Sequence, residues 1–108
     1  MTIISRHSPH ATLINVFTVK PGNAAELTAL LDRATEQVMR HVPGFVSANI
    51  HVSTDGTRVV NYAQWENPQA YQAMLANPTA REHMGAAAAL AEGFDPHLYT
   101  VESVHQRP

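Results

Sequence analysis

The sequence predicts an α+β protein with the ferredoxin-like order β-α-β-β-α-β, folded as a four-stranded antiparallel sheet with helices on one face. Four apolar, β-branched stretches predict the strands, at Thr12–Val19, Phe45–Ser53, Thr57–Glu66 and His97–His105. The two middle stretches are joined through Asp55-Gly56, a dipeptide typical of type I′ hairpins. A helical pattern separates the first strand from the second, and another separates the third from the fourth. This is the arrangement of the split β-α-β motif.

The first strand is expected to end at Lys20-Pro21-Gly22, because proline and glycine interrupt extended structure. Asn23 followed by Glu26 fits a capping box, in which the two side chains satisfy backbone N–H groups at a helix start. Apolar side chains then recur at helical spacing. This pattern predicts a helix over Ala24–His41.

The second half of the chain repeats the sequence of strand, helix and strand. Asn67-Pro68 supplies an N-cap and a first-turn proline for a second helix, which Asn77-Pro78 interrupts. Thr79 is expected to cap the helix that follows. Gly93–Pro96 is expected to be a loop before the last strand, His97–His105.

A two-residue loop would fix the pairing of the two middle strands. The expected pairs are Ile50 with Asn61, Ala48 with Ala63, and Val46 with Trp65. The face that carries these residues is apolar apart from one amide and one indole N–H, so it should lie under the helices. The other face is mixed, and its members are Phe45, Ser47, Asn49, His51, Val60, Tyr62 and Gln64. A second copy of the chain is the expected cover for it, giving a homodimer with a dimeric α/β barrel.

Asn61 is the unusual residue of the apolar face. An amide buried without a partner costs about 1–3 kcal/mol, so it should have either a protein partner or a ligand. Trp65, four residues on, adds a donor-only N–H to the same face. Asn15 is the equivalent residue of the first strand and also alternates with apolar neighbours. The alternative is that both asparagines pair with neighbouring backbone and the tryptophan is ordinary core.

Composition limits the class of protein. The chain has 108 residues, a net charge of −2 and no cysteine, which predicts one domain without disulfides, over residues 11–106 after a flexible tail of residues 1–10. No basic stripe is present, which argues against a nucleic-acid partner. No apolar run approaches the length of a membrane helix and no secretory signal is seen, so the expectation is a soluble, cytoplasmic protein.

Few catalytic motifs are available. The seven histidines have no metal-ligand spacing, so no metal site is expected. There is no phosphate loop, no nucleophile elbow and no carboxylate inside a strand. An enzyme built from this chain would have to use neutral hydrogen-bonding groups and the reactivity of its substrate.

Four stretches carry a resemblance to a known family: Val42-Pro-Gly-Phe-Val-Ser-Ala, Ser53-Thr-Asp-Gly-Thr, Val59-Val-Asn-Tyr-Ala-Gln-Trp-Glu, and Gln69-Ala-Tyr71. They resemble the antibiotic biosynthesis monooxygenase family, and the likeness covers nearly the whole domain. The resemblance implies a dimeric ferredoxin-like enzyme. It also implies oxidation of an anthrone or polycyclic phenol to a quinone with O₂ as co-substrate and no cofactor.

The resemblance also implies roles for individual residues. Asn61 and Trp65 match catalytic positions, and Asn15 is similar to a first-strand asparagine of one relative. Tyr71 matches a substrate-pocket tyrosine. The other expected substrate-site residues are Ile50, Ala63, His83 and Met84. Ile50 stands where a relative has tyrosine, and Met84 falls near a family arginine, with Arg81 and His83 alongside.

Two other functions fit the same fold. A haem-degrading monooxygenase of the superfamily would use His83 as its axial ligand. A non-catalytic dimeric module would bind an aromatic ligand without consuming O₂. A flat multi-ring ligand is the expectation in the monooxygenase reading, because small side chains leave room for it, at Ala63, Ala73, Ala87 and Ala88.

Overall fold

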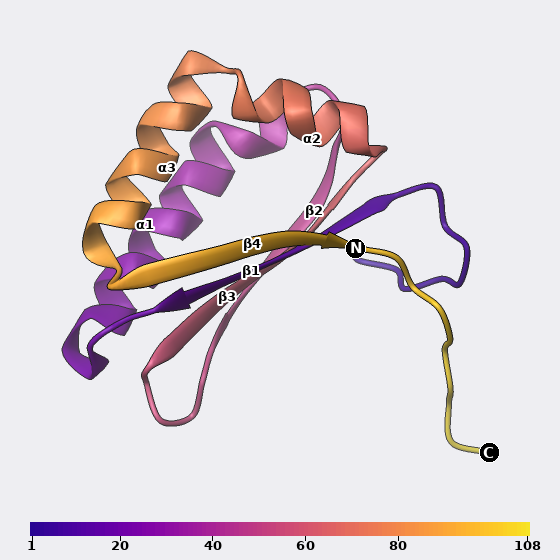
Figure 1. Ribbon diagram of the computed structural model, residues 1–108, viewed down its shortest axis with the longest axis horizontal. Coiled ribbons are helices and arrows are strands. Elements are labelled where there is room, and N and C mark those ends of the chain that lie inside the picture. Colours follow the sequence, from indigo (N-terminus) through magenta and orange to yellow (C-terminus); the bar gives the residue numbers. More distant parts are fainter.

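The computed structural model describes residues 1–108 and confirms the predicted architecture, a four-stranded antiparallel sheet with helices on one face (Figure 1). The elements in chain order are β1 (Ala11–Thr18), α1 (Ala24–Gln37), β2 (Phe45–Val52), β3 (Arg58–Trp65), α2 (Pro68–Leu75), α3 (Pro78–Leu90) and β4 (Gly93–Tyr99). The strands lie in the order β2-β3-β1-β4, so β1 and β3 are the central pair. None of the helices is long and apolar enough to cross a membrane.

Asparagine caps start both C-terminal helices. The Asn67 side chain accepts a hydrogen bond from the backbone N–H of Ala70 at 2.8 Å, as predicted. The expectation that Thr79 caps α3 is wrong, because Asn77 accepts from the N–H of Ala80 at 3.0 Å. In both helices a proline follows the cap, where its missing N–H costs nothing.

The capping box predicted at the start of α1 does not form. Pro21–Asn23 makes a short 3₁₀ turn that leads directly into α1, so Asn23 has a helical backbone and its side chain makes no cap hydrogen bond. An N-cap residue needs an extended backbone to reach the next turn. The predicted long helix is also shorter, since α1 ends at Gln37 and Met39–His41 is a separate 3₁₀ turn.

An irregularity in β2 places Phe45, instead of the expected Val46, opposite Trp65. The pairs Ile50–Asn61 and Ala48–Ala63 are as predicted, but Trp65 pairs with Phe45 instead of Val46. The register shifts between Phe45 and Ser47, as in a β-bulge, and this rotates Phe45 onto the helix side. Its ring packs edge-on against the indole of Trp65, with centroids 5.6 Å apart at 89°. The strict two-residue alternation that placed Phe45 on the outer face could not anticipate the extra residue.

The hairpin turn also differs from the type I′ prediction. Gly56 has φ of 73°, whereas Asp55 does not adopt a positive φ, and type I′ requires both. The Asp55 carboxylate instead organises the turn as an acceptor. It takes hydrogen bonds from Ser53 Oγ at 2.7 Å, Thr57 Oγ1 at 2.7 Å and the Thr57 backbone N–H at 3.0 Å.

These three donors are expected to make the hairpin acid-sensitive. The side-chain hydrogen bonds from Thr57 and Ser53, with the Thr57 backbone N–H, lower the pKa of Asp55 from 3.8 to about 2. Because the folded pKa is the lower one, the carboxylate stabilises the fold above about pH 4, and this contribution is lost as the pH falls towards 2. An NMR titration of the Asp55 carboxyl should give a midpoint near 2, and Thr57→Val should raise it. A midpoint near 3.8 in the unsubstituted protein would contradict the assignment.

β4 occupies different residues from those predicted. It runs from Gly93 to Tyr99, so the expected loop Gly93–Pro96 is strand and the residues after Tyr99 are not. Gly93 and Pro96 are ordinarily loop signals, but β4 is an edge strand that pairs only with β1. An edge strand tolerates proline, because one side of it makes no ladder hydrogen bonds.

The core lies between the sheet and the helices and is divided into two buried clusters. One cluster contains Leu13 of β1 and Ala63 of β3, and the other contains Phe17 and Val59 of the same strands. Asn15 and Asn61 stand between these positions in the two strands. The asparagines therefore lie where the apolar core is interrupted.

The opposite face of the sheet carries no helix (Figure 1). The N-terminal residues contact part of this outer face. Thr2 Oγ1 donates to Ser47 Oγ at 2.9 Å, and Gln64 Nε2 donates to the carbonyl of Ile3 at 2.7 Å. Gln64 is 3% exposed as a result. The centre of the outer face carries Val60 and Tyr62, which are only half-buried.

Candidate active site

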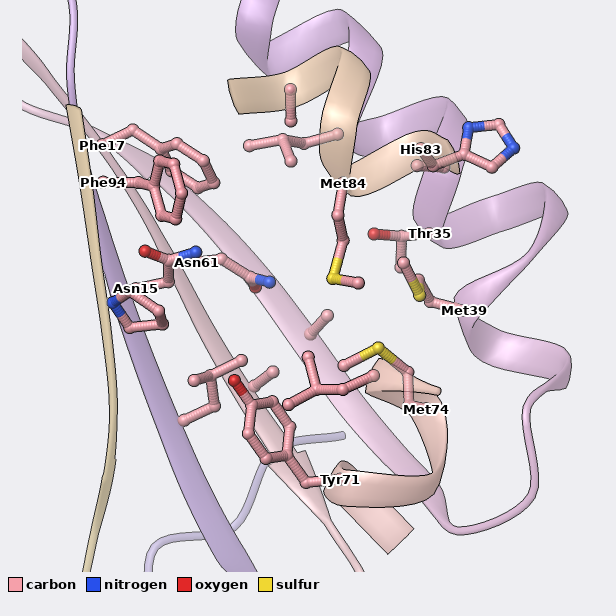
Figure 2. Close-up of a pocket in the computed structure, with 18 of the residues that line it drawn as sticks. Asn15, Phe17, Thr35, Met39, Asn61, Tyr71, Met74, His83, Met84 and Phe94 are labelled. Carbon is pink, nitrogen blue, oxygen red and sulfur yellow. The ribbon is translucent and has the colours of Figure 1, made fainter. Parts of the chain in front are cut away.

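A cavity of about 370 Å³ lies between the inner face of the sheet and the helices (Figure 2). Of the 22 residues that line it, 16 are hydrophobic. None of its side chains is a carboxylate, a lysine or an arginine, so no fixed charge faces the interior. The non-hydrophobic lining residues are Asn15, Thr35, Asn61, His83, Gly85 and Pro96.

Asn15 and Asn61 form the polar centre of the sheet wall. They are direct cross-strand partners on β1 and β3, so their amides lie side by side on the face that borders the cavity. The Oδ1 atoms of both are buried and have no hydrogen-bond partner. The alternative that neighbouring backbone satisfies these amide oxygens is therefore wrong. Each orphaned acceptor costs about 1–3 kcal/mol, which a ligand with a hydroxyl or N–H group would recover.

Trp65 supplies a third unpaired polar atom. Its side chain is 2% exposed, and its Nε1 is buried without an acceptor. The indole is held between two aromatic rings, because Phe45 and Tyr71 pack against it with centroids 5.6 and 6.4 Å away. The donor is thus fixed in direction, as electrostatic stabilisation of a ligand requires.

Tyr71 reaches the cavity from α2 (Figure 2). It is 8% exposed, and its burial raises the pKa of the phenol above the usual 10. The hydroxyl therefore stays protonated at neutral pH and acts as a neutral hydrogen-bonding group. A role as the base that removes a substrate proton is disfavoured, because the phenolate would be even less stable here than in water.

The remaining expected residues divide into three groups. Ala63 and Met84 line the cavity, and Met84 points from α3 towards the asparagines (Figure 2). His83 also borders the cavity, but its imidazole points away from the asparagines. Ile50 does not line the cavity and instead borders a surface groove between α1 and β2. Of the small residues expected to leave room, Ala87 and Ala88 line the cavity with Ala63, whereas Ala73 is exposed on α2.

Several lining residues were not predicted from the sequence. Met39 and Met74 place their thioethers in the cavity together with Met84, so every methionine after Met1 lines it. Methionine fills irregular apolar space and adapts its shape to a ligand, so three internal methionines were an available signal. Phe94 was missed because its segment was expected to be a loop, and Thr35 was missed because it lies in the middle of a helix.

The arrangement suits one kind of chemistry. Neutral donors and acceptors that are fixed in an apolar, water-poor space stabilise charge that develops on a bound molecule. The residues present do not offer paired carboxylates or an activated nucleophile. Nowhere in the structure do three His, Asp or Glu side chains come together as ligands for a metal ion.

Comparison with known proteins identifies the family of this chain. The family model described as antibiotic biosynthesis monooxygenase matches residues 11–86. A tetracenomycin-F1 monooxygenase of Streptomyces glaucescens is 47% identical over 83 residues, which are 77% of this chain and 74% of that protein. The solved structure of a monooxygenase from the ActVA-Orf6 gene of Streptomyces coelicolor, in complex with nanaomycin D, superposes with a TM-score of 0.83 and 34% identity over 94% of this chain and 95% of that one.

A second solved structure is that of SnoaB, a cofactor-independent oxygenase from Streptomyces nogalater, in a variant with one asparagine replaced by alanine. It superposes with a TM-score of 0.79 and 28% identity, over 89% of this chain and 96% of that one. The family match covers both central strands and the asparagine pair between them. By fold and by sequence alike, this chain belongs to the antibiotic biosynthesis monooxygenase family.

Proposed function

We propose that the protein is a cofactor-independent monooxygenase that oxidises an anthrone or polycyclic phenol, an aromatic polyketide intermediate, to a quinone with O₂. The observation that carries the proposal is the set of three buried, unpartnered polar atoms on residues that line an apolar cavity, Asn15 Oδ1, Asn61 Oδ1 and Trp65 Nε1. Similar proteins support the substrate class, since one is a tetracenomycin-F1 monooxygenase and another binds nanaomycin D. A third is described as a cofactor-independent oxygenase.

The asparagines and the tryptophan act on the anion of the substrate. The central C–H of an anthrone is acidic because the resulting carbanion is also an aromatic phenolate. Amide N–H groups of Asn15 and Asn61 and the indole N–H of Trp65 donate to the oxygen that carries this charge. The amide oxygens accept from hydroxyl groups of the same ligand. The anion is therefore bound more tightly than the neutral substrate, which lowers the barrier to its formation.

The substrate itself supplies the electrons for the oxidation. Its anion gives one electron to O₂, and the resulting radical and superoxide combine to form a C–O bond. Protonation gives a hydroperoxide. Loss of water from the hydroperoxide leaves the quinone carbonyl, so one O₂ converts the CH₂ group to C=O and H₂O. The electron-rich ring thus takes the part that a flavin plays in other oxygenases.

Oxygen consumption by the purified protein tests the proposal. With anthrone, an oxygen electrode should record one O₂ for each quinone formed, and dialysis against a chelator should leave the rate unchanged. The protein should also be colourless, because neither flavin nor haem is required. A stoichiometric flavin, haem or metal that is needed for turnover would contradict the proposal.

Oxygen consumption and a haem titration separate the two other functions. A binding module would take up the aromatic ligand without consuming O₂. A haem-degrading enzyme would show a Soret shift on haem titration that His83→Ala abolishes. The geometry does not favour haem ligation, because the His83 imidazole points away from the centre of the cavity (Figure 2).

A homodimer is part of this proposal. The accessible surface is 6978 Å², whereas a monomeric protein of 11.8 kDa is expected to expose about 5,900 Å². Tyr99 of β4 is a large, exposed side chain that pairs with Thr12 on the outer face of the sheet. No helix covers the outer face of the sheet, at whose centre Val60 lies. A second copy packed on this face would cover Val60 and Tyr99 and reduce the accessible surface.

A further inference from the structure

Two threonines of α1 behave differently. Thr28 donates its hydroxyl to the carbonyl of Ala24, four residues back, at 2.8 Å. This is the usual arrangement of a threonine inside a helix, because the back-bond satisfies the hydroxyl locally. Thr35 makes no such bond, and its Oγ1 points into the cavity (Figure 2). Because the Thr35 hydroxyl is not used in a back-bond and faces an apolar cavity, it is free to bind a ligand.

The position of Thr35 strengthens this interpretation. It is the only lining residue on α1 with a hydrogen-bonding side chain, since the others contributed by that helix are Leu31 and Ala34. Its hydroxyl faces the sheet wall that carries Asn15 and Asn61 (Figure 2). The apolar space between these two walls is bordered by methionine and alanine side chains. A ligand that reaches from the asparagine pair to Thr35 would meet a hydrogen-bonding group at each end.

We propose that Thr35 is a substrate-positioning residue that hydrogen-bonds a ring hydroxyl of the polycyclic substrate on the side away from the asparagine pair. This inference rests on the proposed function and names a specificity determinant of the same site. The asparagines and Trp65 hold the part of the ligand where charge develops. Thr35 holds a remote substituent, so it selects among ring systems that differ in hydroxylation and does not take part in the oxidation.

The role predicts a split between binding and turnover. Thr35→Val keeps the β-branched shape and removes only the hydroxyl. It should raise KM by about 2- to 12-fold, the range for one neutral hydrogen bond, for those substrates that carry the recognised hydroxyl. The kcat should stay within twofold of the unsubstituted enzyme, because the hydroxyl does not contact the reacting atoms. Thr35→Ser, which restores the hydroxyl, should restore the KM.

A series of monohydroxyanthrones, with unsubstituted anthrone as the reference, identifies the contact. Thr35→Val should weaken at least one hydroxylated member and leave the unsubstituted compound unaffected. Thr28→Val is the matched control, since it removes a hydroxyl of the same helix that lies outside the cavity. It should bind every compound as the unsubstituted protein does. The proposal would be overturned if the KM of Thr35→Val equalled that of the unsubstituted enzyme for every compound. It would also be overturned if the KM rose as much for unsubstituted anthrone as for the hydroxylated members. Water would then be the partner of the Thr35 hydroxyl.

Binding can be measured without turnover. Trp65 is the only tryptophan and lines the cavity, so quenching of its fluorescence by hydroxyanthraquinones reports occupancy directly. The Kd of the affected quinone should rise in Thr35→Val by the same factor as KM. If the unsubstituted protein neither binds these quinones nor consumes O₂ with anthrones, the proposed function itself fails. If it does both while Thr35→Val is unchanged, only the role of Thr35 fails.

Discussion

Asn61→Ala and Trp65→Phe are each expected to lower kcat for an anthrone by roughly 10- to 1,000-fold. That range corresponds to about 1.4–4 kcal/mol for each donor that stabilises developing charge. Both residues line the cavity and carry a buried polar atom without a partner, so each substitution removes a polar group that makes no hydrogen bond within the protein. The fall should be seen in kcat more than in KM, because the contact strengthens as the anion forms. Steady-state oxygen consumption at saturating anthrone measures it.

Stability measurements separate this effect from misfolding. Trp65→Phe keeps most of the apolar bulk against Phe45 and Tyr71, and Asn61→Ala removes an amide oxygen that has no partner, so both variants should melt cooperatively. Asn15→Ala should act in the same direction. Asn23→Ala is the matched control, since that side chain caps nothing and lies outside the cavity. Full turnover in both Asn61→Ala and Trp65→Phe would assign the two residues a purely structural role.

Val60→Asp is expected to dissociate the dimer or to unfold the protein. Val60 lies on the outer face of the central strand β3, between Val16 of β1 and His51 of β2. A charge placed there would be buried without a partner in the dimer, which costs on the order of 3–5 kcal/mol. Sedimentation velocity at micromolar concentration should show the dimer replaced by an 11.8 kDa monomer or by aggregate.

Thr54→Asp provides the control for charge alone, because Thr54 is exposed in the hairpin turn. This variant should remain dimeric and melt as the unsubstituted protein does. A stable monomer of the unsubstituted chain at micromolar concentration would remove the basis for the interface. A dimer that persists in Val60→Asp would place the interface on another surface.

Local signals predicted most of the sheet. Period-two alternation and the hairpin placed Asn61 and Ala63 on the helix side and gave their β2 partners correctly. The same alternation in β1 predicted that Asn15 lies on the apolar face. The structure adds that Asn15 pairs directly with Asn61, which is far from it in sequence. These predictions succeeded because strand pairing and the burial of one face depend on nearest neighbours along each strand.

The errors arose where tertiary context overrides local preference. The shift between Phe45 and Ser47 adds a residue that no alternation pattern reveals, and it makes Phe45 the partner of Trp65 in place of Val46. Pro96 suggested a loop, but an edge strand accepts it. The cavity depends on helix placement, so Met39 and Met74 could not be assigned to it from spacing within their own short segments. The direction of a single hydroxyl, that of Thr35, is likewise a property of the assembled fold.

The pairing of Asn15 with Asn61 gives the cavity a local symmetry. Antiparallel strands are related by a two-fold axis that passes between directly paired residues, so the two amides are equivalent about it. The residue four positions after Asn61 is Trp65, and the residue four positions after Asn15 is Val19, which is also buried. A flat ligand that met only the two amides would fit equally well after a half-turn. Trp65, on one side of the axis, offers an indole N–H, whereas Val19, on the other side, has no polar group and does not line the cavity. Under the proposed function, the two orientations of the ligand therefore differ in energy, and one ring edge is turned towards the donors.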